Sequence, residues 1–131
     1  MSKREVVSSA LAEPTGHYSH AITIAAAGTL VFISGMTART VDGGIAGIGD
    51  VAQQTHQTCR NLQAAVEQAG GSLQDIVRVD VFVADIRHFD VIHEVRRQYF
   101  TGVAPASTMV EVSKFVKPEY LIEINAIAVV T

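Results

Sequence analysis

The sequence predicts an α+β domain in which two helices pack on one face of a mixed sheet. Short apolar runs of strand length alternate with two longer segments that have helical spacing, and turns rich in glycine or polar residues separate them. The chain has 131 residues, which is enough for one hydrophobic core and short for two. We therefore expect a single domain over residues 1–131.

The N-terminal part of the chain predicts three strands followed by a loop. Residues 4–9 (REVVSS) and 21–26 (AITIAA) are short strand candidates. Residues 29–36 (TLVFISGM) are apolar almost throughout, which is typical of a strand buried on both faces. Residues 40–50 (TVDGGIAGIGD) are rich in glycine, so we expect a surface loop there.

The two helices are expected on either side of a central strand. Asp50 is a suitable N-cap for a helix that runs to Ala69 and that the following pair of glycines ends. Residues 86–100 predict the second helix. The apolar stripes consist of Cys59, Leu62 and Val66 in the first helix and Phe89, Ile92, Val95 and Tyr99 in the second.

Three further strands complete the predicted sheet of six. Residues 76–85 (IVRVDVFVAD) alternate valine with other residues, so one face of this strand is expected in the core. Residues 107–113 (STMVEVS) and 120–130 (YLIEINAIAVV) predict the last two. The final strand is apolar nearly throughout, yet helices on one face leave the other face of the sheet uncovered. We therefore expect a homo-oligomer that covers this face.

Composition and charge exclude several classes of function. The net charge of −3 and the lack of basic runs argue against a nucleic-acid partner. The lone Cys59 excludes an internal disulfide and fits a reducing compartment. Residues 1–10 lack an apolar signal core, and the longest apolar stretch, residues 21–36, falls short of the roughly 20 residues that span a membrane. A cytoplasmic protein without a membrane partner is expected.

No motif indicates a metal ion or a cofactor. His17 and His20 stand three residues apart but belong to no pattern of metal ligands, and the glycine-rich loop matches no phosphate-binding fingerprint. Cys59 lies on an apolar helical stripe, where a core residue is expected and not a catalytic thiol. We expect neither a metal nor a cofactor.

Two carboxylates interrupt otherwise apolar strands. Glu111 and Glu123 are candidates for a site because an ionised carboxylate within a sheet is costly unless it is paired or lies at a cleft. Strand alternation is expected to point Glu111 outward. Glu123 belongs to the more apolar strand, which makes it the stronger candidate for a functional role.

Five stretches in order resemble the Rid/YjgF group of reactive intermediate deaminases, over nearly the whole chain. GHYSHAI is similar to the group's GPYSQAI, LVFISGM to LVFVSGQ, FDVIHEVRRQYF to FaavNevYaeYF and YLIEINAIAV to vlIEIeAIAv. The segment from Val51 to Ile86 also follows the group's pattern closely. The resemblance implies a chorismate-mutase-like fold and a homotrimer whose sheets face inward as a barrel, with clefts between subunits.

The resemblance also implies an activity. Characterised members hydrolyse enamines and imines such as 2-aminoacrylate, releasing ammonia and a 2-oxo acid, and relatives include 2-aminomuconate deaminases. The sequence is therefore expected to encode a hydrolytic deaminase of a small enamine or imine metabolite, for example one of the 2-aminomuconate type. The alternative is a non-catalytic trimer that binds a small metabolite. Endoribonuclease activity, attributed to some members, is disfavoured by the acidic composition.

The chain departs from the group at several cleft positions. Group members carry PARS where this chain reads PAS, so Ser107 stands at the place of an arginine that clamps the substrate carboxylate. A hydroxyl cannot reproduce the planar fork of a guanidinium. His20, His93 and Arg96 replace glutamine, asparagine and tyrosine, and Met36 replaces another glutamine. Arg96, one helical turn after His93, is a candidate replacement cation for an anionic ligand; the alternative is a solvated helix residue.

The resemblance assigns provisional roles to the matching residues. The expected catalytic residues are Glu123, which orients the attacking water, Tyr18, which lines the cleft, and His93, which relays a proton. The expected substrate-binding residues are Ser34, Gly35, Ser107, Thr108, His20 and Arg96. Ser107 and Thr108 are expected to hydrogen-bond one substrate oxygen, and His20 is an alternative proton relay.

Overall fold

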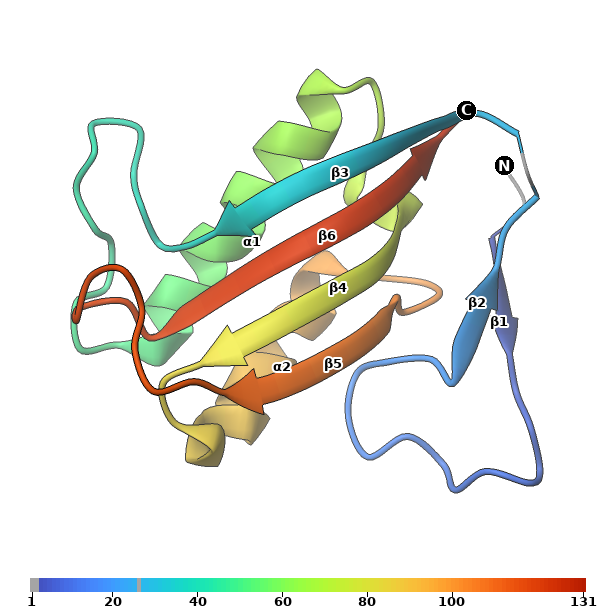
Figure 1. Ribbon diagram of the computed structural model, residues 1–131, viewed down its shortest axis with the longest axis horizontal. Helices are drawn as coiled ribbons and strands as arrows, with labels where there is room; N and C mark the ends of the chain where they lie inside the picture. The colour runs from blue at the N-terminus through green and yellow to red at the C-terminus, as the bar shows by residue number, and fades with distance from the viewer. Residues whose placement is uncertain (1–2, 26) are drawn as a thin grey trace.

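The computed structural model describes residues 3–25 and 27–131, and it places two helices behind a four-stranded sheet with a two-stranded ribbon beside it (Figure 1). The elements are β1 (Arg4–Val6), β2 (Ala21–Thr23), β3 (Thr29–Met36), α1 (Val51–Gln68), β4 (Ile76–Val83), α2 (Phe89–Tyr99), β5 (Ala106–Glu111) and β6 (Ile122–Val130). Single 3₁₀ turns precede β4 (Leu73–Asp75) and α2 (Ile86–His88). The predicted fold class and order of elements are confirmed.

The six strands form two sheets, and the expectation of one six-stranded sheet is corrected. Among residues 3–25 and 27–131, the larger sheet has the order β3-β6-β4-β5, and β1 pairs with β2 alone. The loop between β1 and β2 accounts for this separation, because the Ser19 N–H donates to the Pro105 carbonyl at 3.3 Å. This contact holds the ribbon near the start of β5, at the opposite edge from β3. Both ribbon strands are shorter than predicted; Ala26, at the end of the predicted second strand, lies outside the described residues.

The larger sheet is mixed, as expected. β4 runs parallel to β5, whereas β6 runs antiparallel to both β3 and β4. A register shift between Ile76 and Arg78 interrupts the pairing of β4 with β6. As a result Ile76 is fully buried and Val77 only half-buried, a detail that the simple alternation of valines does not predict.

Helix α1 follows its prediction closely. The Asp50 carboxylate accepts the N–H of Gln53, and Gly70 adopts a φ of 90° just after the helix, which an L-residue with a side chain rarely does. Helix α2 begins later than predicted because the Asp85 carboxylate accepts the Arg87 N–H and starts a 3₁₀ turn. The chain therefore turns tightly between β4 and α2.

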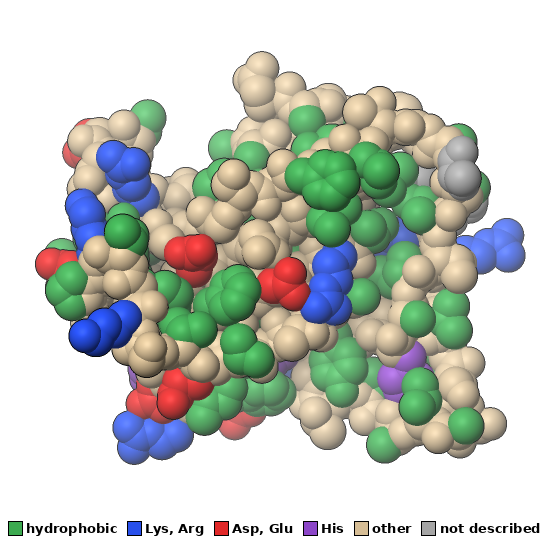
Figure 2. All heavy atoms as spheres, in the orientation of Figure 1, with side chains coloured by type: hydrophobic (Ala, Val, Ile, Leu, Met, Phe, Trp, Pro, Cys, Tyr) green, Lys and Arg blue, Asp and Glu red, His purple; other side chains and the backbone are tan. Residues whose placement is uncertain are grey.

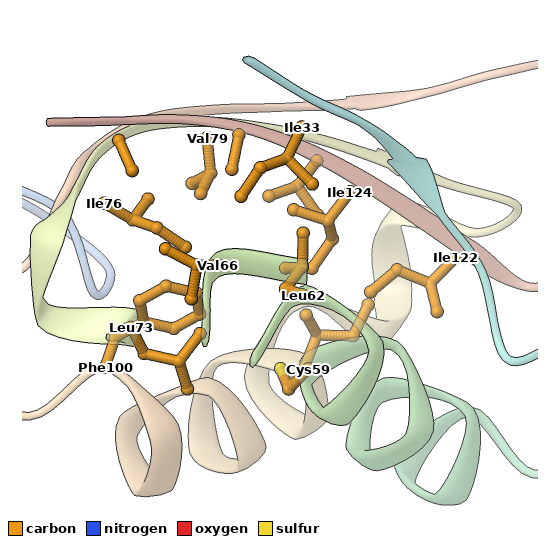
Figure 3. Close-up of a cluster of buried hydrophobic side chains, with 14 of the residues drawn as sticks. Ile33, Cys59, Leu62, Val66, Leu73, Ile76, Val79, Phe100, Ile122 and Ile124 are labelled. Atoms are coloured by element: carbon orange, nitrogen blue, oxygen red, sulfur yellow. The ribbon is translucent and has the colours of Figure 1, made fainter. Parts of the chain in front are cut away.

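The hydrophobic core lies between the sheet and the two helices (Figure 3). The buried side chains come from alternate positions of the strands and from one stripe of each helix. Those labelled in the figure are Ile33, Cys59, Leu62, Val66, Leu73, Ile76, Val79, Phe100, Ile122 and Ile124. Burial raises the pKa of the Cys59 thiol to about 12, as suits the core residue predicted there.

No helix among residues 3–25 and 27–131 covers the opposite face of the sheet (Figure 1), and hydrophobic, acidic and basic side chains are all visible on it (Figure 2). Leu30 and Phe32 of β3 are 60% and 72% exposed there. The same face carries an ion pair between Arg78 and Asp80 at 2.6 Å. We call this surface the open face.

No helix within residues 3–25 and 27–131 is long and apolar enough to cross a membrane.

Candidate functional site

The predicted site residues, together with His17, fall into two clusters and a loop. The α2–β5 cluster consists of His17, His93, Arg96 and Ser107 on the helix side of the sheet. The β3–β6 cluster consists of Ser34, Gly35 and Glu123 on the open face. The remaining candidates lie in the loop before β2 or on the other side of β5.

Arg96 is the most unusual residue of the α2–β5 cluster. It is completely buried, and its Nη2 donates to Ser107 Oγ at 3.1 Å. Its Nε and Nη1 have no hydrogen-bond partner in the part of the chain that the structure describes. Burial lowers the pKa of the guanidinium to about 10, so it remains a cation at neutral pH. The expectation of a solvated helix residue is therefore wrong.

His93 is buried next to Arg96 on α2. Its Nδ1 lies 2.9 Å from the Phe89 carbonyl, which can only accept, so Nδ1 carries the proton. The unprotonated Nε2 faces Gly16, where a Cβ would lie only 2.6 Å away. Burial is the main cause that lowers the pKa of His93, and the nearby Arg96 adds to the effect. His93 is therefore a neutral imidazole at pH 7.

His17 belongs to the same cluster, although the sequence patterns did not single it out. Its Nε2 lies 2.7 Å from the Phe100 carbonyl, at the end of α2. Burial lowers the pKa of His17, and Arg96 and Arg97 lower it further. The signal that could have found it is the histidine in GHYSHAI, which stands where the resembling sequences have proline.

Tyr18 and His20 hold the loop between β1 and β2 together. The Tyr18 hydroxyl accepts the Thr15 N–H at 3.4 Å. His20 accepts the Ser8 N–H at Nδ1, so its Nε2 carries the proton and donates to the Ala12 carbonyl at 2.6 Å. Both ring nitrogens of His20 are thus engaged, and His20 lines a hollow of about 460 Å³ beside β1, apart from both clusters.

Ser107 and Thr108 lie on opposite faces of β5, so they cannot share one substrate oxygen as expected. Ser107 pairs in register with the buried Val79 and points to the helix side. Thr108 pairs with Asp80 on the open face, where its hydroxyl accepts from Arg78 Nη2 at 2.8 Å. The cause is the alternation of side chains along a strand, which separates consecutive residues.

The β3–β6 cluster places a carboxylate against a strand backbone. Glu123 lies between the buried Ile122 and Ile124, so its side chain points to the open face. Its carboxylate lies directly over Gly35, where a Cβ would overlap Oε2. Ser34 lines an adjoining hollow of about 290 Å³ with Asp80 and Asn125. A carboxylate in this position can accept a proton from a water molecule.

Glu111, the other candidate carboxylate, has a local role. It is exposed, as expected, and its Oε1 accepts the Ile86 N–H at 3.0 Å. It therefore links the end of β5 to the turn that precedes α2.

Across the described residues, no group of three or more His, Cys, Asp and Glu side chains is arranged to hold a metal ion.

A single chain does not bring the two clusters together. Glu123 on β6 and Ser107 on β5 are separated by β4, about 10 Å at the usual strand spacing, and they point to opposite faces. However, β3 and β5 are the two outer strands of the sheet, and each cluster lies at one of these edges.

Comparison with known proteins shows likeness along almost the whole chain. A family model described as Endoribonuclease L-PSP matches residues 8–130. A RutC family protein of Pyrococcus abyssi is 36% identical over 128 residues, 98% of each chain. A protein of Dermatophagoides farinae named 2-iminobutanoate/2-iminopropanoate deaminase is 30% identical over 131 residues, 99% of each chain.

The fold is also similar to that of solved structures. The crystal structure of YyfB from Yersinia pestis, a Rid family protein of unknown function, matches with a TM-score of 0.90 and 27% sequence identity. The match covers 99% of this chain and 100% of the other.

Proposed function

Because the chain belongs to the Rid/YjgF family, whose matching family model is described as Endoribonuclease L-PSP, we propose that it is a hydrolytic deaminase of a small imine or enamine. The family includes a relative named as a 2-iminobutanoate/2-iminopropanoate deaminase. The observation that carries the proposal is the Glu123 carboxylate, which lies over the Gly35 backbone on the open face. The finer proposal is a substrate of the 2-aminomuconate type.

The proposed active site is a cleft between two copies in a homotrimer. One copy contributes Glu123 with Ser34 and Gly35 from its β3 edge, and the neighbour contributes the α2–β5 cluster from its β5 edge. The exposed apolar residues on the open face, Leu30 and Phe32, support an assembly that covers them. Tyr18 is proposed to form one wall of the cleft.

The proposed reaction is the addition of water to a C=N bond. An enamine first takes a proton at carbon and releases one from nitrogen, which converts it to the imine. Glu123 accepts a proton from water as the oxygen bonds to the imine carbon, and the C=N π electrons move to nitrogen, which takes a proton. The amino group of this adduct then takes a second proton while the hydroxyl group gives one up, so that the C–N bond breaks, ammonia leaves and a carbonyl remains. His93 can relay a proton through its unprotonated Nε2.

Ammonia release from freshly generated 2-aminoacrylate and 2-aminomuconate, measured against spontaneous hydrolysis, tests the proposal. The substitution Glu123→Gln keeps the shape of the side chain but removes its basicity. We expect it to lower the enzymatic rate by roughly 10²–10⁴-fold, the usual contribution of a general base. Glu67→Gln, at an exposed position near the end of α1, is the matched control and should keep wild-type activity.

Unchanged turnover by Glu123→Gln with an intact assembly would refute the role of this carboxylate. Binding of a substrate analogue without any acceleration of hydrolysis would favour the second candidate, a non-catalytic trimer that binds a small metabolite. The observation that favours this alternative is Ser107, which occupies a position where the resembling deaminases have arginine. The net charge of −3 gives no support to an RNA substrate.

A further inference from the structure

Arg96 is a buried cation that has no counter-charge among the described residues. No carboxylate lies within ion-pair distance of the Arg96 guanidinium in the described part of the chain. Ser107 is the one hydrogen-bond partner of this guanidinium there. The titratable groups beside it, His17, His93 and Cys59, are uncharged at neutral pH, because the pKa of both histidines is lowered and burial raises that of the thiol to about 12. A buried charge is costly unless an opposite charge or hydrogen bonds offset it. The guanidinium can therefore compensate the charge of an anion that the described residues do not supply.

Ser107 connects this cation to the surface. Its Oγ accepts a hydrogen bond from Arg96, so its own hydroxyl proton remains free to donate. Ser107 is half-buried, and it belongs to β5, which has a paired strand on one side only. A hydroxyl that accepts from a cation is polarised and becomes a stronger donor to an anion on its other side.

We propose that Arg96 and Ser107 form a two-residue relay that binds the carboxylate of the substrate. Ser107 donates its hydroxyl to a carboxylate oxygen at the β5 edge, and Arg96, a positioning residue, supplies the compensating charge from behind. The positive charge therefore lies on α2, and the hydroxyl group that contacts the ligand lies on β5. A single guanidinium matches a monoanion, so the site takes a carboxylate in preference to a dianionic phosphate. The identity of the carboxylate as part of an imine or enamine rests on the proposed function.

Binding of pyruvate, measured by isothermal titration calorimetry, tests the relay without any turnover. Pyruvate carries the carboxylate and no nitrogen to release, and pyruvamide is its neutral counterpart. We expect wild-type protein to bind pyruvate at least tenfold more tightly than pyruvamide. The reason is that a charge-assisted hydrogen bond stabilises a complex more than a neutral one, by an amount that corresponds to about tenfold in affinity. Arg96→Met should weaken pyruvate binding by at least about 30-fold and leave pyruvamide binding unchanged.

Two further variants keep the test decisive. Arg97→Met removes a neighbouring, exposed arginine that pairs with Glu94 and should bind pyruvate like the wild type. Ser107→Ala should weaken pyruvate binding by roughly tenfold, and it decides the question if Arg96→Met does not fold. A merely structural Arg96 would change stability without changing the preference for pyruvate over pyruvamide.

The outcomes separate this inference from the proposed function. Equal binding of the two probes by the wild type, no binding of pyruvate, or undiminished pyruvate binding by the Arg96 and Ser107 variants would overturn the relay. If pyruvate binds as expected but no imine is hydrolysed, the relay stands and the proposed deaminase fails. If imines are hydrolysed equally by wild type and Arg96→Met, the deaminase stands and the relay fails.

Discussion

At the scale of single residues, the α2–β5 cluster combines one permanent cation with two imidazoles that are held neutral. Arg96 lowers the pKa of both His17 and His93, in addition to the larger effect of burial. Protonation of either ring would place a second positive charge beside the guanidinium. Both rings therefore resist protonation in the folded state, and this makes the free energy of unfolding depend on pH.

We predict that His93 makes the folded state less stable as the pH falls below about 6.5, the ordinary histidine pKa. Above this pH both states carry a neutral ring, so the contribution of His93 is fully present. Below it the unfolded state binds a proton that the folded state binds only at a lower pH, so the free energy of unfolding decreases until the folded-state pKa is passed.

Urea unfolding of wild type and His93→Gln between pH 7.5 and 5 measures this effect. The free energy of unfolding should fall more steeply toward low pH in the wild type than in the variant. Contributions from the carboxylates are common to both proteins and cancel in the comparison. Parallel curves for the two proteins would show that His93 is not protected from protonation in the fold.

At the scale of the elements, the bulge in β3 and the neighbouring strand β6 position the proposed catalytic carboxylate. The pairing of β3 with β6 shifts between Ile33 and Met36, and Gly35 lies within this irregular segment. The missing side chain at Gly35 leaves the space that the Glu123 carboxylate fills. The two strands thus form one unit, in which β3 leaves the space at Gly35 and β6 supplies the Glu123 carboxylate that fills it.

Gly35→Ala tests this unit. The added Cβ would overlap Glu123 Oε2, so the carboxylate has to move away from the cleft. We predict that ammonia release falls by about 10²-fold, as expected when a general base is misplaced, with the fold and assembly retained. In the Glu123→Gln background the same substitution should have little further effect, because the two changes act on one group. Independent, multiplying effects would contradict a positioning role for Gly35.

The helices and strands were largely predictable from the sequence, but the arrangement of the strands in two sheets was not. Asp50 as N-cap and the glycines after Ala69 defined α1, because capping is a local property of the chain. The separation of β1 and β2 from the larger sheet depends on contacts such as Ser19 with Pro105, which are distant in sequence. Periodicity carries no information about such contacts.

The same limit applies to the candidate site. Glu123 could be selected because a carboxylate in an apolar strand is locally anomalous. The burial of Arg96 could not, because a charged residue on a predicted helix is ordinarily solvated and its partner Ser107 lies on a different element. The opposite orientation of Ser107 and Thr108 follows from strand alternation and was within reach of the sequence.

At the scale of the whole molecule, the two proposed half-sites lie at opposite edges of one sheet. The β3–β6 cluster lies at one edge and the α2–β5 cluster at the other. A cyclic assembly pairs unlike edges of neighbouring subunits, so each interface would receive both halves. The proposed active site is therefore a property of the assembly, with Glu123 and Arg96 supplied by different subunits.

Mixed assemblies of Glu123→Gln and Arg96→Met subunits test whether the active site is shared between subunits. Each variant alone should hydrolyse imines poorly at low substrate concentration. After the two are unfolded together and refolded as a random equimolar mixture, about one quarter of the interfaces in a cyclic trimer should hold an intact Glu123 opposite an intact Arg96. We predict that ammonia release recovers to about that fraction of the wild-type rate. Mixed assemblies that form but remain as inactive as the separate variants would contradict a site shared between subunits.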